Sequence, residues 1–370
     1  MPSQRLVYSR RIRSTPFEQR VFENGVSAVS VYNHMTLGSV FRSPVEDYEH
    51  LRRYVQVWDV SCQRQVEVVG TDALALVELT TPRDISCCDI GQCLYTPLVD
   101  ENGGIVNDPV ILRLDTDRFW ISIADSDVLL WLKGLAAGRG MDVRVFEPDV
   151  SPLAVQGPLS DDLMEMLAGP EARELGNFRF ILCELAGTPV VLARSGWSGQ
   201  CGFEIYLQDS SRGLDLWDLV WTEGQPFNIR AGCPNLIERL EAGLLSYGSD
   251  ITLETNPMEC GLDRFYRLGK TAEYLSRDAL DRISREGVRR RLVHLLIPGD
   301  AVPAPRTVYR VSDGSGHMVG IVTSLAWSPR FRGNLSFATV DVPALEPGTV
   351  LTVHTSDGDR EGTVRNRTWQ

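Results

Sequence analysis

Hydrophobic and polar positions along the first half of the chain predict a mixed order of strands and helices. Residues 64–69 (RQVEVV) alternate polar and apolar side chains, as a half-buried strand does. Thr71 then stands where a helix cap is expected, ahead of an apolar segment that ends at Leu79. The remaining elements predicted here are strands over 94–99, 105–114, 118–124 and 141–146 and a helix over 126–135 behind a serine cap. Because these elements do not repeat as β-α-β units, residues 55–147 are predicted to form an α+β subdomain.

A second series of the same kind follows after residue 147. The elements predicted there are strands over 153–156, 183–185, 190–194 and 202–207 and helices over 159–167, 214–221 and 234–245. Pro234 opens the last helix, at a position where the missing N–H of proline has no partner to lose. The pattern therefore predicts a second α+β subdomain, into which the first is inserted.

The pattern changes beyond residue 286, where short apolar runs alternate with Gly, Pro, Asp and Ser. Strands are predicted over 292–297, 308–311, 319–323, 335–340 and 350–354. Short strands separated by turns are typical of a small all-β barrel or sandwich. The predicted division is an α+β region over 1–285, with 55–147 inserted between 1–54 and 148–285, and a β domain over 286–370 behind a solvated connector over 284–291.

Composition and charge exclude several classes of protein. The 370 residues include 37 Lys or Arg and 49 Asp or Glu, which gives a formal net charge of −12. Because nucleic-acid affinity depends on clustered cations, we expect no nucleic-acid partner. No apolar run approaches the roughly 18 residues that cross a bilayer, and the first residues (MPSQRLVYSRRIRS) lack the apolar centre of a secretory signal. We therefore expect a cytoplasmic protein with no membrane partner.

The usual cofactor and catalytic motifs are missing from the sequence. The eight cysteines form no C-x-x-C pair, and the five histidines do not lie near one another at ligand spacing, so reduced thiols and no metal are expected. G-x-G-x-x-G, G-x-x-x-x-G-K-[ST], G-x-S-x-G and H-E-x-x-H are all absent. This argues against nicotinamide enzymes, P-loop NTPases, serine hydrolases and zinc proteases.

Three glycine-rich stretches with aromatic and acidic residues remain, and the first runs from Gly91 to Pro109. It contains Tyr95 and the turn cluster DENGG ahead of Asp108. A carboxylate after a Gly-rich hairpin can point into a cleft, and it can equally cap a turn. The spacing alone leaves both interpretations of Asp108 open.

The second stretch reads RSGWSGQCGFEIY and carries glycines at a spacing of three. Such glycines let the backbone approach something flat, and Trp197 and Tyr206 can stack on a planar ring or face a cation. If Phe203 and Ile205 face the core, Glu204 shares the opposite face with Tyr206. Glu204 can there accept two N–H donors from an aminopyrimidine edge, but a tight turn followed by an exposed alternation explains the same pattern.

The third stretch runs from Gly232 to Asp250 and contains the predicted helix over 234–245. Glu238 and Glu241 lie three residues apart, so they share a face beside Arg239. Arg239 can hold an anionic tail, and a capped amphipathic helix with local ion pairs is the alternative.

In this order the three stretches resemble the folate-dependent aminomethyltransferase family, the T-protein of the glycine cleavage system. Its motifs G-G-I-x-x-D, R-x-G-Y-x-G-E-x-G-F-E-I and R-L-E-A-G-x-x-x-Y-G correspond to GGIVND at 103–108, RSGWSGQCGFEI at 194–205 and RLEAGLLSYG at 239–248. GIVTS at 320–324 is also similar to the family's closing domain. The resemblance covers almost the whole chain. It implies a multi-domain α+β fold with a small C-terminal β-barrel, and tetrahydrofolate as the methyl acceptor.

Other runs are similar to the branch of this family that demethylates dimethylsulfoniopropionate, among them RIRSTPF at 11–17, VYNHM at 31–35 and CPNLIER at 233–239. This implies methyl transfer from the sulfonium to N5 of tetrahydrofolate, with methylmercaptopropionate and 5-methyltetrahydrofolate as products. The chain also departs from the branch, because S-K-Q-G-G-[FY]-E reads SGQCGFE at 198–204, which removes a lysine and introduces Cys201.

The resemblance implies a role for each candidate residue. Asp108 matches the position near folate N10, and with a sulfonium donor its work is to orient the folate. The predicted catalytic residues are Asp108, Trp197 and Tyr206, the predicted folate-binding residues are Tyr95, Asp108, Trp197, Glu204, Tyr206 and Arg239, and the predicted substrate-binding residues are Phe17, Tyr32, Trp197 and Tyr206.

Two other functions stay open at the level of the sequence. One is a related tetrahydrofolate-dependent enzyme that acts on an N-methyl amine or a glycine-cleavage intermediate. The other is a non-catalytic folate-binding scaffold. The expected partners are a small-molecule methyl donor and folate, and a homodimer is left open.

Overall fold

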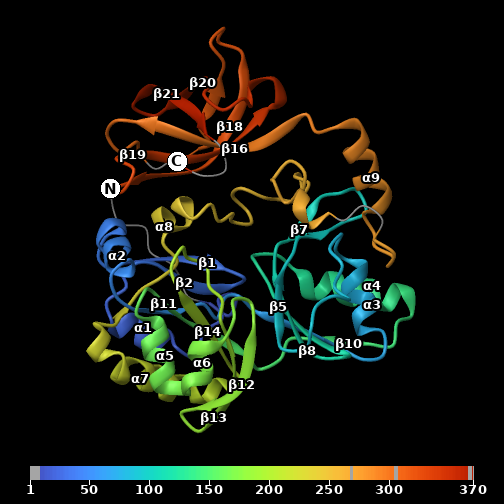
Figure 1. The fold of residues 1–370 in the computed structure, drawn as a ribbon, viewed down its shortest axis with the longest axis vertical. Helices are drawn as coiled ribbons and strands as arrows, with labels where there is room; N and C mark the ends of the chain where they lie inside the picture. The colour runs from blue at the N-terminus through green and yellow to red at the C-terminus, as the bar shows by residue number, and fades with distance from the viewer. Residues whose placement is uncertain (1–8, 267–269, 304–306, 366–368, 370) are drawn as a thin grey trace. The chain divides into compact units, whose positions relative to one another are not determined.

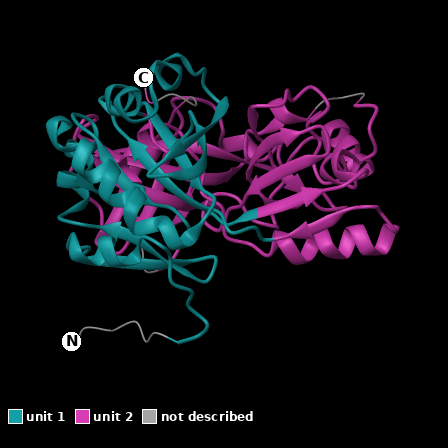
Figure 2. Cartoon of the chain, turned by 90° about the horizontal axis from the view of Figure 1, so that it is seen from below, with its two compact units in different colours: residues 1–65, 147–196, 200–235 teal, residues 66–146, 197–199, 236–370 magenta. Residues whose placement is uncertain are grey.

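The computed structural model describes residues 9–266, 270–303, 307–365 and 369. The chain divides into two compact units (Figure 2). Unit 1 comprises residues 1–65, 147–196 and 200–235, and unit 2 comprises residues 66–146, 197–199 and 236–370. In each unit, segments that are far apart in the sequence therefore share a core.

Unit 1 is built on a six-stranded sheet in the order β12-β13-β14-β11-β3-β15. Its strands are β3 (Gln56–Asp59), β11 (Ser151–Gln156), β12 (Phe180–Leu185), β13 (Thr188–Ala193), β14 (Gly202–Leu207) and β15 (Arg230–Ala231). The helices α5 (Ser160–Ala168), α6 (Pro170–Glu174) and α7 (Gly213–Glu223) pack along this sheet (Figure 1). Apolar side chains of the sheet and helices, Trp217 among them, form one core.

Unit 1 begins with four short elements that the sequence pattern did not predict: α1 (Glu18–Glu23), β1 (Ala28–Tyr32), β2 (Met35–Val40) and α2 (Pro44–Leu51). Asn33 and His34 both have positive φ and make the two-residue turn between β1 and β2. Ser43 caps α2, because its hydroxyl oxygen accepts the N–H of Glu46 at 3.1 Å. Charged residues interrupt the apolar runs here, so the local pattern is weak.

The first part of unit 2 is a five-stranded sheet in the order β10-β4-β9-β8-β5. Its strands are β4 (Gln65–Val69), β5 (Gln92–Tyr95), β8 (Val110–Asp115), β9 (Arg118–Ser122) and β10 (Arg144–Phe146). Helices α3 (Ala73–Leu79) and α4 (Val128–Arg139) pack on it and close an apolar core. A short hairpin of β6 (Leu98–Val99) and β7 (Ile105–Asn107) stands apart from this sheet.

The C-terminal part of unit 2 is a closed barrel, which confirms the predicted β-barrel. Its strands are β16 (Arg290–Pro298), β17 (Arg310–Ser312), β18 (Met318–Ser328), β19 (Gly333–Asp341), β20 (Val350–Thr355) and β21 (Gly358–Arg365), in the order β16-β19-β18-β17-β20-β21. Helices α8 (Leu236–Glu241) and α9 (Arg277–Glu286) come before it along the chain (Figure 1). The sequence pattern missed β21, in which charged residues and glycine outnumber apolar ones.

The predicted strand over 105–114 is two strands, and the break determines where Asp108 lies. Strand β7 ends at Asn107 and β8 begins at Val110, so Asp108 and Pro109 lie between them. Proline has no N–H to donate to a strand ladder, so it interrupts the pairing. Asp108 is thereby placed in the short segment between the two strands.

Other predicted boundaries were wrong for local reasons. The Ser126 hydroxyl does not cap a helix but donates to the Val106 carbonyl at 2.7 Å, and α4 begins at Val128. The predicted helix over 234–245 ends at Glu241, because the chain turns at Gly243 with φ 72°. The predicted connector over 284–291 is largely structured, since α9 runs to Glu286 and β16 begins at Arg290.

Candidate functional site

Strand β14 of unit 1 has the alternation predicted for residues 202–207. Phe203 and Ile205 pack in the core, so Glu204 and Tyr206 share the opposite face. The Tyr206 hydroxyl donates to Oε2 of Glu204 at 3.2 Å, and the Ser195 hydroxyl donates to the same oxygen. Burial raises the pKa of the Glu204 carboxyl, and the two hydrogen bonds oppose that rise. Glu204 is a buried residue, and its Oε1 accepts no hydrogen bond from the described residues, so this oxygen is open to a ligand donor.

The glycines around Trp197 serve the protein's own side chains. A Cβ at Gly196 or at Gly202 would lie 2.2 Å from the side-chain amide of Gln156. A Cβ at Gly199 would lie 2.9 Å from Oε1 of Glu238. The spacing of these glycines predicted a close approach to something flat. At two of the three positions the flat group is the Gln156 amide.

Tyr95 and Asp108 form a pair in unit 2. Tyr95 ends strand β5, Asp108 lies between β7 and β8, and the Tyr95 hydroxyl donates to Oδ2 of Asp108 at 2.9 Å. Burial is the largest influence on Asp108 and raises the pKa of its carboxyl to about 7, against the effect of the Tyr95 hydrogen bond. Burial and the neighbouring Asp108 hold the pKa of Tyr95 well above its usual value. Tyr95 therefore stays a donor, whereas Asp108 changes charge near neutral pH.

A buried asparagine fixes the backbone next to Asp108. The side chain of Asn107 donates to the Ala124 carbonyl at 3.0 Å and to the Ser126 hydroxyl at 2.8 Å, and it accepts the Ala124 N–H at 2.9 Å. The Tyr247 hydroxyl donates to the Ile105 carbonyl at 3.2 Å, on the other side of the same short strand. Sequence reasoning missed Asn107, although an asparagine at the end of an apolar run was the available signal.

Arg239 is engaged by groups of unit 2. Its side chain is 5% exposed, and Nη1 lies 2.7 Å from Oδ2 of Asp250, while Nη2 donates to the Ser324 hydroxyl at 2.5 Å. Its Cζ also lies 5.6 Å from the ring centroid of Trp197, which is half-buried. Arg239 thus supports the Trp197 ring and joins α8 to barrel strand β18. The structure does not leave its guanidinium open to an anionic tail.

Phe17 and Tyr32 of unit 1 are not brought together with Glu204. Phe17 is fully buried in the core formed by Phe203 and its neighbours, on the face of the sheet opposite Glu204, with its ring centroid 6.4 Å from that of Trp217. Tyr32 ends strand β1, beside the tight turn, and is half-buried. The structure gives Phe17 a packing role, and the substrate contact assigned to Tyr32 stays a prediction.

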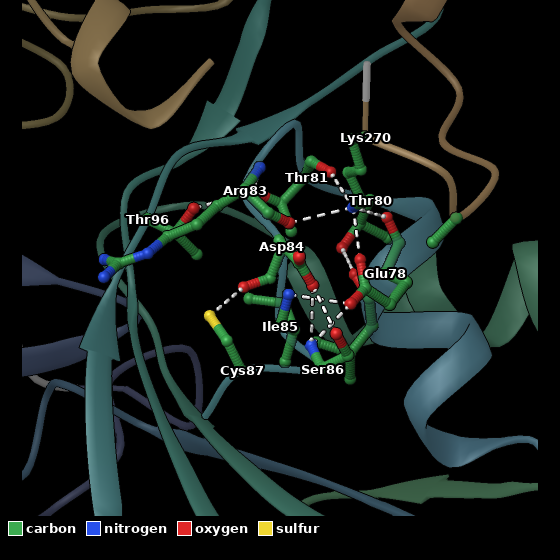
Figure 3. Close-up of polar contacts among 12 residues, drawn as sticks. Glu78, Thr80, Thr81, Arg83, Asp84, Ile85, Ser86, Cys87, Thr96 and Lys270 are labelled. Atoms are coloured by element: carbon green, nitrogen blue, oxygen red, sulfur yellow. Dashed lines mark hydrogen bonds and ion pairs between the residues drawn. The ribbon is translucent and has the colours of Figure 1, made fainter. Parts of the chain in front are cut away.

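Lys270 is a buried lysine that was not among the predicted site residues, and it fixes the loop that joins α3 to β5. Nζ of Lys270 donates to the carbonyls of Glu78, Thr81 and Arg83 at 3.0, 2.8 and 2.8 Å and forms an ion pair with the Glu78 carboxylate (Figure 3). The carboxylate also accepts the N–H groups of Ile85 and Ser86, each at 2.7 Å. These contacts immobilise the turn between α3 and β5.

The described residues suit binding and orientation. They include a buried carboxylate and a half-buried one, phenols that donate hydrogen bonds to them, and an indole ring held by a guanidinium. Across the described ranges, no group of three or more His, Cys, Asp or Glu is placed to hold a metal ion, and no helix is long and apolar enough to cross a membrane.

Comparison with known proteins identifies the class. The model of the GCVT N-terminal domain matches residues 17–270, and that of the glycine cleavage T-protein C-terminal barrel domain matches residues 290–368. The chain therefore belongs to the glycine cleavage T-protein (aminomethyltransferase) family, an enzyme family, as its motifs indicated. The glycine cleavage aminomethyltransferase T of Bartonella henselae has the same fold, with a TM-score of 0.86 over 96% of this chain and 97% of that one at 23% identity.

Several curated relatives are similar over long stretches. The dimethylsulfoniopropionate demethylase of Ruegeria pomeroyi is 46% identical over 98% of both chains. The aminomethyltransferase of Bacillus pumilus is 30% identical over 85% of this chain and 86% of its own. The trimethylamine-oxide aldolase of Ruegeria pomeroyi is 32% identical over 86% of this chain, which corresponds to 41% of that longer protein.

Proposed function

We propose that this protein is a tetrahydrofolate-dependent methyltransferase that demethylates dimethylsulfoniopropionate and passes the methyl group to N5 of tetrahydrofolate. The observation that carries the proposal is the 46% identity to the Ruegeria pomeroyi demethylase over 98% of both chains. The matches to both family models, over residues 17–270 and 290–368, support the same conclusion and the proposed division into a folate-binding region and a C-terminal barrel.

The reaction fits a site that binds and aligns. A sulfonium leaves as a neutral thioether, so methyl transfer to N5 needs no covalent nucleophile on the protein. It needs sulfur, methyl carbon and N5 in line with water excluded, and such positioning can supply roughly 7–11 kcal/mol. The ring of Trp197, held by Arg239, is the proposed face for the cationic donor. An aromatic face binds the cation without the strong ground-state attraction of a carboxylate, which would oppose the loss of charge.

Two carboxylates are proposed to hold the folate. Oε1 of Glu204 lacks a partner among the described residues, which supports a contact with an N–H donor of the pterin. Asp108, with Tyr95 as its donor, is proposed to orient the folate near N10. Tyr206 is proposed to fix the Glu204 carboxylate through its hydroxyl.

Product analysis tests the proposal. Purified protein is incubated with tetrahydrofolate and dimethylsulfoniopropionate, and 5-methyltetrahydrofolate and methylmercaptopropionate are quantified. Equal amounts of both products are expected. Parallel reactions use dimethylglycine and trimethylamine N-oxide as donors, because the aldolase relative acts on an amine oxide. If methylene-folate or formaldehyde forms, and only with those donors, the protein acts on N-methyl amines and the proposal is wrong. Folate binding with no turnover on any donor would favour a scaffold.

A further inference from the structure

Two arginines of unit 2 lie against one aromatic ring next to the Tyr95–Asp108 pair. The Cζ atoms of Arg83 and Arg264 lie 5.0 and 4.7 Å from the ring centroid of Phe265. The same ring makes an edge contact with Tyr95 at a centroid distance of 5.5 Å. Two cations therefore lie around one ring, immediately beside the donor of Asp108.

Neither guanidinium has a carboxylate partner among the described residues. Other arginines of the chain do pair with carboxylates, as Arg118 does with Glu67 at 2.8 Å. Nη1 of Arg83 donates to the backbone carbonyl of Tyr95 at 2.5 Å, and Arg264 is exposed. Burial, reinforced by the charge of Arg264, lowers the pKa of Arg83, as expected for a cation without a counter-ion.

The Arg83 side chain is also anchored at its base. Lys270 binds the Arg83 carbonyl at 2.8 Å, and in Figure 3 the Arg83 side chain extends away from that cluster. A pre-positioned guanidinium loses little freedom on binding an anion, and its planar fork matches a carboxylate. Arg239 cannot serve this purpose, because Asp250 and Ser324 occupy its guanidinium.

We propose that Arg83 and Arg264 form a carboxylate-binding subsite beside the Tyr95–Asp108 pair. The inference rests on the proposed function, which supplies two carboxylates: the glutamyl tail of tetrahydrofolate and the propionate end of the methyl donor. Both present the same chemistry to a pair of guanidinium groups.

The test separates the two sources. Dissociation constants for tetrahydrofolate and for tetrahydropteroate, which lacks the glutamate, are measured by calorimetry for the wild-type protein, Arg83→Gln and Arg264→Gln. The KM for dimethylsulfoniopropionate is measured on the same proteins. Arg310→Gln is the matched control, since Arg310 is exposed on the barrel of the same unit and loses the same charge. Unfolding midpoints verify that each variant is folded. Because Arg264 is exposed, Arg264→Gln is expected to disturb the fold less than Arg83→Gln does.

A tail contact predicts that each variant weakens tetrahydrofolate by about 10- to 100-fold and leaves tetrahydropteroate unchanged. A donor contact predicts a similar rise in the KM for dimethylsulfoniopropionate with both folate affinities unchanged. Arg310→Gln should change nothing. Unchanged values in both variants, or equal losses for both folates without a change in KM, would overturn the subsite. If the wild-type protein binds tetrahydrofolate but does not demethylate the donor, the proposed function fails. The folate dissociation constants then still show whether the two arginines bind the glutamyl tail. If it binds neither folate, both fail.

Discussion

At the scale of single residues, Asp108 carries a carboxyl group whose charge changes near neutral pH. Burial raises the pKa of its carboxyl to about 7. If the ionised carboxylate orients the folate, kcat/KM should rise with pH along a limb centred near this value. Asp108→Asn keeps the shape and an acceptor for Tyr95 but cannot ionise. We expect the variant to lose the limb and most of its activity at pH 8, as measured in a pH profile of kcat/KM. An unchanged limb would assign it to another group.

The same shift predicts how stability depends on pH. The unfolded carboxyl ionises near pH 4 and the folded one near pH 7, so the folded state binds more protons between these values. The burial of a charge therefore lowers the free energy of unfolding progressively as pH rises from about 4 to about 7. The gain in unfolding free energy from Asp108→Asn should grow over this range and stay constant above it. Denaturant unfolding at pH 5 and pH 8 measures the difference, and a larger gain at pH 5 would contradict it.

Trp197 is the second residue that allows a sharp comparison. Its ring is held by Arg239, whereas Cys201, a few residues along, is exposed. A desolvated cation over an indole gains on the order of 2 kcal/mol, which is about 30-fold in affinity. Trp197→Ala should therefore lower kcat/KM by about 30-fold or more, and Cys201→Ala should leave it nearly unchanged. Equal kinetics in the two variants would remove the stacking argument.

At the scale of elements, sequence pattern worked where one periodicity continued without interruption. Strand β14 matches its predicted bounds, because alternating Phe203, Ile205 and their polar neighbours specify both the strand and its buried face. The pattern failed where a single residue overrides it. Pro109 divides an apolar run into β7 and β8, and Ser126 bonds to a distant carbonyl in place of capping a helix. Such competition between partners is decided by tertiary contacts.

The turn between α3 and β5 depends on Lys270. The chain has only two lysines, Lys133 and Lys270, and only the second is buried. Lys270→Met removes the ammonium from three carbonyls and leaves the Glu78 carboxylate buried without its counter-ion. We expect a loss of about 3–5 kcal/mol in the free energy of unfolding, measured by denaturant titration. Lys133→Met is the matched control and should change it by less than about 0.5 kcal/mol. Similar stabilities in the two variants would show that the cluster is not structural.

At the scale of the whole molecule, Trp369, near the end of the chain, joins the barrel to helix α8. Its indole N–H donates to the Leu240 carbonyl at 2.7 Å, and its ring stacks on His294 at a centroid distance of 4.6 Å. Trp369→Ala should reduce the free energy of unfolding by about 3–5 kcal/mol. Trp327, which is half-buried on β18, provides the control. A smaller loss of unfolding free energy is expected for Trp327→Ala. An equal or larger loss would show that Trp369 stabilises the protein no more than a half-buried tryptophan does.

The sequence by itself determined the family, the α+β class, the C-terminal β domain and the core-facing residues of β14, because these follow from motifs and from periodicities that local residues carry. It also predicted Asp108, Trp197 and Glu204 as site residues, and these roles stay predictions. Only the tertiary structure decided which of the candidate groups are already engaged. Arg239 is neutralised by Asp250, Phe17 is packed in the core, and the unpaired guanidinium groups belong to other residues. The physical reason is that the partner of a charged or apolar side chain lies far away in the sequence, and only folding brings the two together.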